Sequence, residues 1–259
     1  MIIDGHVHVW PDKIARRALA TPSQRIRRFG DGTVTAAREA MARAGVDHAI
    51  CLAVADAPER LDAANRFVGG LPDPFIGFGT VHADRTPEEN LASLREHGCR
   101  GVKVHPLFQG YALDDRRLWN ILEALEGEFV CVFHVGPEQP GEPNVLAPPR
   151  MLADIARAFP NLDIVAAHLG GYHVMDEALE HLIGLPIYLD TSWPPSIATV
   201  GPARVRSVIE RHGPDRVVFA TDWPMADPAE EIAAIEALRL PPEHTEAILG
   251  GNLARLLGL

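Results

Sequence analysis

Two histidines stand two residues apart near the start of the chain, in the segment Asp4-Gly5-His6-Val7-His8. A short apolar run precedes them and predicts a β-strand, in which residues i and i+2 point to the same face. Both imidazoles can therefore approach one ion, and neutral imidazole is the commonest protein ligand for metals such as zinc, copper, iron and nickel. Alone, the pair is better explained as two surface histidines on an edge strand, so its interpretation depends on residues further along the chain.

Ionisable side chains at later apolar runs supply further candidates. Lys103 is flanked by valines, His134 and His168 each end an apolar run, and Asp222 ends the run Val217–Asp222. In isolation each has an ordinary role, as a hydrogen-bonded core histidine, a lysine reaching solvent or an aspartate capping the next helix. Burying all of them in one place is costly unless a metal organises them. The set therefore favours a metal-dependent site.

Length and composition bound the class of protein. The 259 residues are 47% hydrophobic and 23% charged, which is typical of a globular chain with a sizeable core. A net charge of -11 argues against nucleic acid as a partner. No signal peptide and no apolar run of about 18 residues is present, so we expect neither export nor a membrane partner. Three cysteines, two of them within apolar runs, indicate reduced thiols and a cytoplasmic protein.

Short apolar runs recur along the chain, and stretches of helical character lie between them. The predicted strands cover Ile2–His8, Ala49–Val54, Phe75–Val81, Gly101–His105, Phe129–Val135, Asp163–Leu169, Ile187–Ser192 and Val217–Asp222.

Eight such units predict a single α/β domain over residues 1–259, folded as a closed (β/α)8 barrel. An open doubly wound sheet is the alternative, but no glycine-rich dinucleotide fingerprint follows the first strand. Two long connections, Trp10–Val34 and Gly136–Pro148, would lie at the C-terminal face, where such barrels place their sites. They are interpreted either as lids or as inert surface segments.

At this point the sequence resembles the amidohydrolase superfamily, in particular its compact branch of metal-dependent hydrolases and decarboxylases. The resemblance spans essentially the whole chain. The matching segments are Asp4-Gly5-His6-Val7-His8, Gly101-Val102-Lys103-Val104-His105-Pro106, His134, His168-Leu169-Gly170-Gly171 and Ala220-Thr221-Asp222-Trp223-Pro224.

The resemblance implies that His6, His8, His134 and Asp222 bind a divalent metal, most often zinc. It implies that His168 is either a ligand of a second metal or a catalytic group that contacts substrate. In binuclear members a carboxylated lysine on the fourth strand bridges two metals, and Lys103 stands on the matching strand. We expect one ion, with Lys103 an uncarboxylated cation that binds an anionic group of the substrate.

Several other residues are candidate substrate contacts. His82 and His105 end two predicted strands; a structural role is favoured for both, and His105 is kept as a substrate-binding candidate. Trp193 follows a strand end, where it could form part of an aromatic wall. The segment Trp10–Val34 carries five arginines that could clamp a carboxylate, of which Arg28 is retained as a substrate contact; the five are Arg16, Arg17, Arg25, Arg27 and Arg28.

Three functions are compatible with these residues. The first is a hydrolase in which a metal-activated water attacks an amide, ester or lactone, with Asp222, His168 and Lys103 as catalytic groups. The second is a non-oxidative decarboxylase that uses the same site on a small carboxylic acid. The third is a barrel that binds a ligand without catalysis. Hydrolysis of a small molecule is the preferred hypothesis, and the sequence leaves the substrate and a homo-oligomeric state open.

Overall fold

The computed structural model describes residues 1–19 and 28–259. In this part of the chain eight strands form one sheet, in which the strands neighbour one another in sequence order. The bounds are β1 Ile3–Val7, β2 His48–Leu52, β3 Phe75–Thr80, β4 Gly101–Val104, β5 Val130–Phe133, β6 Ile164–Ala166, β7 Tyr188–Asp190 and β8 Val217–Val218. With helices between successive strands, this is the predicted (β/α)8 barrel fold, and the fold class is confirmed.

The strands are short and buried along their length, because a parallel sheet is covered on both faces and does not alternate apolar with polar residues. All five residues of β1 and all four of β4 and of β5 are buried. The strand pairs β1 with β2 and β3 through β7 run parallel. Each predicted strand is found, shortened by one to four residues at its C-terminal end.

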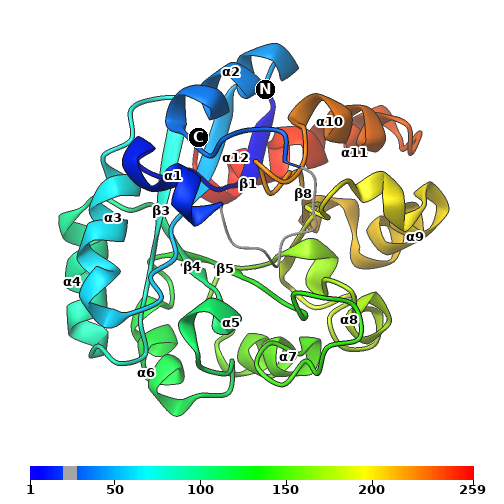
Figure 1. The fold of residues 1–259 in the computed structure, drawn as a ribbon. Coiled ribbons are helices and arrows are strands. Elements are labelled where there is room, and N and C mark those ends of the chain that lie inside the picture. Colours follow the sequence, from blue (N-terminus) through cyan, green and yellow to red (C-terminus); the bar gives the residue numbers. More distant parts are fainter. Residues whose placement is uncertain (20–27) are drawn as a thin grey trace. The chain divides into compact units, whose positions relative to one another are not determined.

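The α-helices follow the strands and pack on their chain neighbours, α3 on α4, α4 on α6 and α7 on α8 (Figure 1). Thr86 caps α4 through a capping box with Glu89. The helix bounds are α1 Asp12–Ala18, α2 Val34–Ala44, α3 Leu61–Gly69, α4 Pro87–Glu96, α5 Pro106–Gln109, α6 Arg116–Leu125, α7 Pro149–Ala158, α8 Met175–His181, α9 Pro202–His212, α10 Pro228–Glu236, α11 Pro242–Glu246 and α12 Asn252–Leu257.

Of the two long connections, one contains an element that the sequence did not predict. The segment Trp10–Val34 is not simply a loop, since it contains the helix α1. An aspartate in its first turn and good helix formers after it explain this. Two of its arginines, Arg25 and Arg27, lie outside the described residues. The described segment Gly136–Pro148 contains no helix or strand, as expected.

The chain divides into two compact units. The first comprises Met1–Cys51, Asp73–Phe75 and Asp190–Leu259. The second comprises Leu52–Pro72 and Ile76–Leu189. The candidate groups on β1 and after β8 thus belong to the first unit, and those on and after β3 to β6 belong to the second.

The cysteines Cys51, Cys99 and Cys131 are buried free thiols. Burial raises the pKa of the Cys99 thiol to about 11, so it stays protonated and unreactive at neutral pH. Across residues 1–19 and 28–259, none of the helices combines the length and apolar character needed to cross a membrane.

Glu231 is a buried carboxylate on α10, in the first unit. Its Oε2 accepts a hydrogen bond of 2.9 Å from the backbone N–H of Ile197, at the start of the 3₁₀ turn Ile197–Val200. Burial raises the pKa of Glu231 to about 7; nearby Glu230 and Asp227 add to the rise, and the bonds from Ser196 and Ile197 oppose it.

Replacing Glu231 with glutamine is expected to remove a pH-dependent loss of stability. Because the native-state pKa lies above the ordinary 4.5, the protein binds this proton more tightly folded than unfolded. The resulting stabilisation is fully present below pH 4.5 and is lost as the pH rises through about 7. Urea unfolding gives the free energy of unfolding of wild type and of Glu231→Gln at pH 5 and at pH 8. The difference between them should shift in favour of Glu231→Gln by about 2 kcal/mol from pH 5 to pH 8. The exposed neighbour Glu230→Gln is the control, and an equal change there would contradict the prediction.

Candidate active site

Backbone hydrogen bonds in the first unit place Asp222 beside the histidines of β1. Gly5 N–H donates to Phe219 O, and Asp222 N–H donates to His6 O, each at 2.8 Å. One step further, His8 N–H donates to Trp223 O at 2.8 Å. The segment after β8 therefore extends alongside β1 and brings residues more than two hundred positions apart in the chain into register.

Gly5, in the middle of the opening motif, is required by this close approach. A Cβ atom at this position would lie 3.0 Å from the backbone oxygen of Phe219 and 3.1 Å from Leu253. Backbone atoms cannot move aside cheaply, so a larger residue would push β1 away from the segment that carries Asp222. The glycine between Asp4 and His6 thus has a packing function that serves the site.

His6, His8 and Asp222 converge at one point. The Nε2 atoms of the two histidines lie 3.1 Å apart. Oδ1 of Asp222 lies 3.5 Å from His6 Nε2 and 3.4 Å from His8 Nε2. Ligands about 2.0–2.2 Å from a tetrahedral zinc ion are roughly 3.4 Å apart. The three donor atoms therefore have the spacing of ligands on one face of a metal ion.

Asp190, at the end of β7, determines which nitrogen of His6 faces this point. Its Oδ2 lies 2.8 Å from His6 Nδ1, and its Oδ1 accepts bonds from the hydroxyl and backbone N–H of Ser192. His6 Nδ1 therefore carries the proton, and Nε2 presents a lone pair toward the Asp222 carboxylate. Two electron-rich atoms 3.5 Å apart require a cation or a proton between them. The donor set thus fits a bound divalent metal, and Asp190 supplies the carboxylate typical of metal-ligating histidines.

Asp4 is completely buried beneath the same residues. Its Oδ1 accepts the backbone N–H groups of His6 at 3.1 Å and Thr221 at 3.0 Å, and its Oδ2 accepts the Thr221 hydroxyl at 2.6 Å. Burial raises the pKa of Asp4 to about 7, against the lowering effect of these bonds. Asp4 therefore joins β1 to the segment before Asp222 and is a positioning residue.

Asp222 and His168 both adopt left-handed backbone conformations, with φ of 61° and 59°. Residues other than glycine rarely occupy this region, and when they do they are concentrated at functional sites. The conformation interrupts the strand pattern at both positions. β8 and β6 end before these residues, at Val218 and Ala166, and are shorter than apolar character alone predicts.

The second unit holds a row of three histidines. His168 Nε2 lies 3.1 Å from His134 Nδ1, and the ring of His134 stacks on the ring of His105 with centroids 4.1 Å apart. All three side chains are buried. Gln109 positions the end of β4, because its Oε1 accepts the His105 N–H at 2.8 Å while its Nε2 donates to Val81 O at 2.6 Å.

Lys103 lies on β4 with none of its surface exposed. Glu138, on the connection after β5, lies near His105 and His134 of the row. Burial raises the pKa of Glu138, Glu142 raises it further, and the Lys103 ammonium opposes both. An ammonium, three imidazoles and a carboxylate are therefore found in the second unit.

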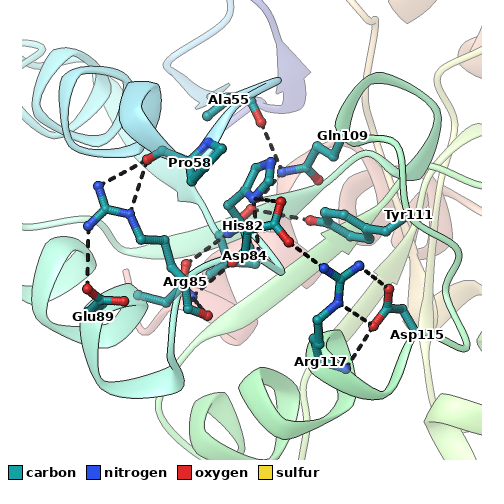
Figure 2. Close-up of polar contacts among 12 residues, drawn as sticks. Ala55, Pro58, His82, Asp84, Arg85, Glu89, Gln109, Tyr111, Asp115 and Arg117 are labelled. Atoms are coloured by element: carbon teal, nitrogen blue, oxygen red, sulfur yellow. Dashed lines mark hydrogen bonds and ion pairs between the residues drawn. The ribbon is translucent and has the colours of Figure 1, made fainter.

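His82, after β3, occupies a polar cluster at the end of that strand (Figure 2). Its Nδ1 accepts the backbone N–H of Asp84 at 3.2 Å, and its ring meets Tyr111 edge-on. Burial lowers the pKa of His82, so the ring is neutral. Arg117 bonds Asp84 and Asp115 on the outside of the cluster. The structural role expected for His82 stays a prediction.

The structure thus distributes the predicted site residues over two groups. His6, His8 and Asp222 come together in the first unit, which also carries the half-exposed Trp193 and the exposed Arg28. The groups of the second unit are Lys103, His105, His134 and His168. Their assignment to one centre with the first group, and the substrate roles of Trp193 and Arg28, stay predictions.

Sequence reasoning missed Asp4 and Asp190 as partners of the site. Asp4 belongs to the opening motif with His6 and His8, but its role follows from its complete burial, which only the fold shows. Asp190 follows an apolar run and contacts a histidine 184 positions away in the chain. An aspartate at a strand end is also common as a helix cap or turn residue, so its type alone does not identify it. Glu138 lay in a connection without a recognisable motif.

Comparison with known families tests the resemblance to the amidohydrolases. The sequence profile described as amidohydrolase matches residues 3–259. The chain belongs to the amidohydrolase family. The resemblance inferred from the histidine and aspartate motifs is thereby confirmed over almost the whole length of this amidohydrolase.

Solved structures share the fold over nearly the full length of the chain. An uncharacterised TIM-barrel protein from Bordetella bronchiseptica is 23% identical, with a TM-score of 0.76 and coverage of 99% of this chain and 98% of that chain. The 5-carboxyvanillate decarboxylase from Sphingomonas paucimobilis is 19% identical, with a TM-score of 0.73 and coverage of 100% and 99%. A probable 2-pyrone-4,6-dicarboxylic acid hydrolase from Acinetobacter baumannii, with citric acid bound, is 18% identical, with a TM-score of 0.69 and coverage of 100% and 99%.

None of the curated proteins searched matches the chain. At these identities the solved structures establish the fold, and they include both hydrolases and decarboxylases.

Proposed function

We propose that this amidohydrolase is a metal-dependent hydrolase of a small molecule, acting on an amide, ester or lactone. The observation that carries the proposal is the convergence of His6 Nε2, His8 Nε2 and Asp222 Oδ1 within 3.5 Å of one another. The support of His6 by Asp190 and membership in a generally metal-dependent family add to it.

The residues that would hold the metal are His6, His8 and Asp222, with His134 as the predicted fourth ligand. When bound there, a zinc ion would lower the pKa of a bound water to about 7 and polarise a carbonyl group. One ion is proposed, with zinc as its identity.

The protein's own groups would perform the remaining steps. The Asp222 carboxylate would accept the proton of the attacking water, since its second oxygen can remain an acceptor. His168, held by His134 at 3.1 Å, would donate a hydrogen bond to the carbonyl oxygen of the substrate. The buried Lys103, uncarboxylated, would bind an anionic group of the substrate, with His105 beside it.

A decarboxylase is the second candidate, favoured by the fold shared with 5-carboxyvanillate decarboxylase. The two reactions differ in their product. Incubation with a panel of carboxylated lactones and aromatic carboxylic acids should give ring-opened acids and no carbon dioxide from the hydrolase. Release of one carbon dioxide per substrate would favour the decarboxylase, and zinc-loaded protein inert toward the whole panel would favour a non-catalytic ligand-binding barrel.

A further inference from the structure

Glu138 lies over the histidine row of the second unit. Its Oε1 is 3.7 Å from His105 Nε2 and 3.8 Å from His134 Nε2. The two imidazoles are stacked almost in parallel, with an angle of 13° between their planes. The Lys103 ammonium attracts the same carboxylate. One carboxylate oxygen therefore lies near two imidazole rings and within the field of a buried ammonium. Because His134 is the predicted fourth ligand of the metal, His105 and Lys103 are the groups that remain to hold a carboxylate here.

A divalent metal shared by His105, His134 and Glu138 is the first interpretation to consider, because their ligand atoms lie within 4.8 Å of one another. Two features disfavour it. A metal lies in the plane of the imidazole that binds it, and two stacked, nearly parallel rings cannot both direct a lone pair at one ion. The buried Lys103 ammonium would also repel a second cation at this position. The cluster is better suited to an anion.

The contacts of Glu138 hold it only loosely. Its Oε1 is buried, yet within the described part of the chain this atom has no hydrogen-bond partner. Distances of 3.7 and 3.8 Å permit electrostatic attraction but exceed those of charge-assisted hydrogen bonds, which are about 2.7–2.9 Å. The side chain as a whole is 39% exposed, so part of it already contacts solvent. A carboxylate with better geometry would therefore compete with it.

The connection that carries Glu138 is tied at its two ends. Gly136 N–H donates to Ala147 O at 2.9 Å, and Asn144 Nδ2 donates to the same oxygen at 3.2 Å. Gly136 has a φ of 106°, and a Cβ there would lie 2.2 Å from Tyr172 O, so only glycine fits this turn. Glu138 follows two residues later and is placed over the histidines by this turn.

We propose that Glu138 occupies, in the ligand-free protein, a subsite built to bind a carboxylate of the substrate, and that the substrate displaces it. The inference deepens the proposed function, on which it rests for the view that Lys103 and His105 face the substrate. It assigns the substrate class as a small carboxylic acid and makes Glu138 an internal competitor for its carboxylate.

Calorimetric titration with benzoate, a monocarboxylate that does not chelate metals, tests the proposal. Glu138→Gln removes the negative charge and keeps the size of the side chain. If Glu138 holds the subsite in about nine molecules of ten, the apparent Kd for benzoate should fall about tenfold in this variant. His105→Asn, which keeps a polar side chain of smaller size, should weaken benzoate binding and thereby locate the site.

Glu142→Gln is the matched control, because it removes the same charge four residues later in the same connection, where Glu142 accepts the Gln139 N–H. An unchanged benzoate Kd in Glu138→Gln, or an equal gain in Glu142→Gln, would overturn the proposal. So would the loss of one zinc equivalent in Glu138→Gln, since Glu138 would then be a metal ligand. If Glu138→Gln binds benzoate more tightly but the wild-type protein shows no catalytic turnover, this inference is supported and the proposed function is contradicted.

Discussion

The Asp222→Asn variant is expected to lose turnover by about 10³-fold or more while keeping its fold. Asparagine has nearly the shape of aspartate, but it cannot accept a proton at neutral pH and is a weaker metal ligand. The loss of a positioned general base alone accounts for about 10²–10⁴-fold. The value of kcat/KM, measured on whichever compound the wild-type protein converts, provides the check.

The backbone conformation of Asp222 makes this substitution a clean one. Its φ of 61° is tolerated by asparagine about as well as by aspartate, and the backbone bond from Asp222 N–H to His6 O is unaffected. The free energy of unfolding should therefore change by less than about 1 kcal/mol. Full activity in a folded Asp222→Asn protein would remove Asp222 from the mechanism.

The Asp4→Ala variant is expected to lose about 3–5 kcal/mol of stability, the largest effect on folding anticipated for a polar residue near the site. It would leave two buried backbone N–H groups, of His6 and Thr221, and the Thr221 hydroxyl without their acceptor. Each buried polar group left unsatisfied costs about 1–3 kcal/mol. Urea unfolding at constant pH measures the change.

Asp47→Ala serves as the control for this prediction. Asp47 also accepts a backbone N–H, that of Ile2 at 2.7 Å, but its side chain is 55% exposed, so water can replace it. Asp47→Ala should lower the free energy of unfolding by less than about 1 kcal/mol. Asp4→Asn keeps an acceptor oxygen, so its loss of stability should lie between those of Asp4→Ala and Asp47→Ala. Equal effects of Asp4→Ala and Asp47→Ala would show that the buried network does not join β1 to the segment before Asp222.

The barrel fold was predictable from the sequence because the strands lie in short, mainly apolar runs, and such runs are typical of strands buried on both faces. Strand ends were less predictable. The run Val217–Asp222 looks uniform, yet regular pairing stops at Val218. Beyond Val218, Thr221 donates hydrogen bonds to Asp4, and Asp222 adopts a left-handed conformation instead of that of a strand. Apolar content does not encode that change.

The candidate site was predictable where local periodicity sufficed. A period of two residues places His6 and His8 on one face of β1, and their Nε2 atoms lie 3.1 Å apart. Partners such as Asp190 and Glu138 depend on which strands and connections become neighbours, and their residue types are common in turns. Packing also overrides local character at His212, a polar residue at the end of α9 that is nevertheless buried.

Metal content per chain tests the central claim most directly. Protein purified without chelator or added metal is analysed by plasma emission, beside a His6→Ala variant that removes one nitrogen of the triad. The account predicts close to one equivalent of zinc in the wild type and close to none in the variant. Wild-type protein that neither carries nor takes up a divalent metal, or a His6→Ala variant that keeps its full equivalent, would contradict it.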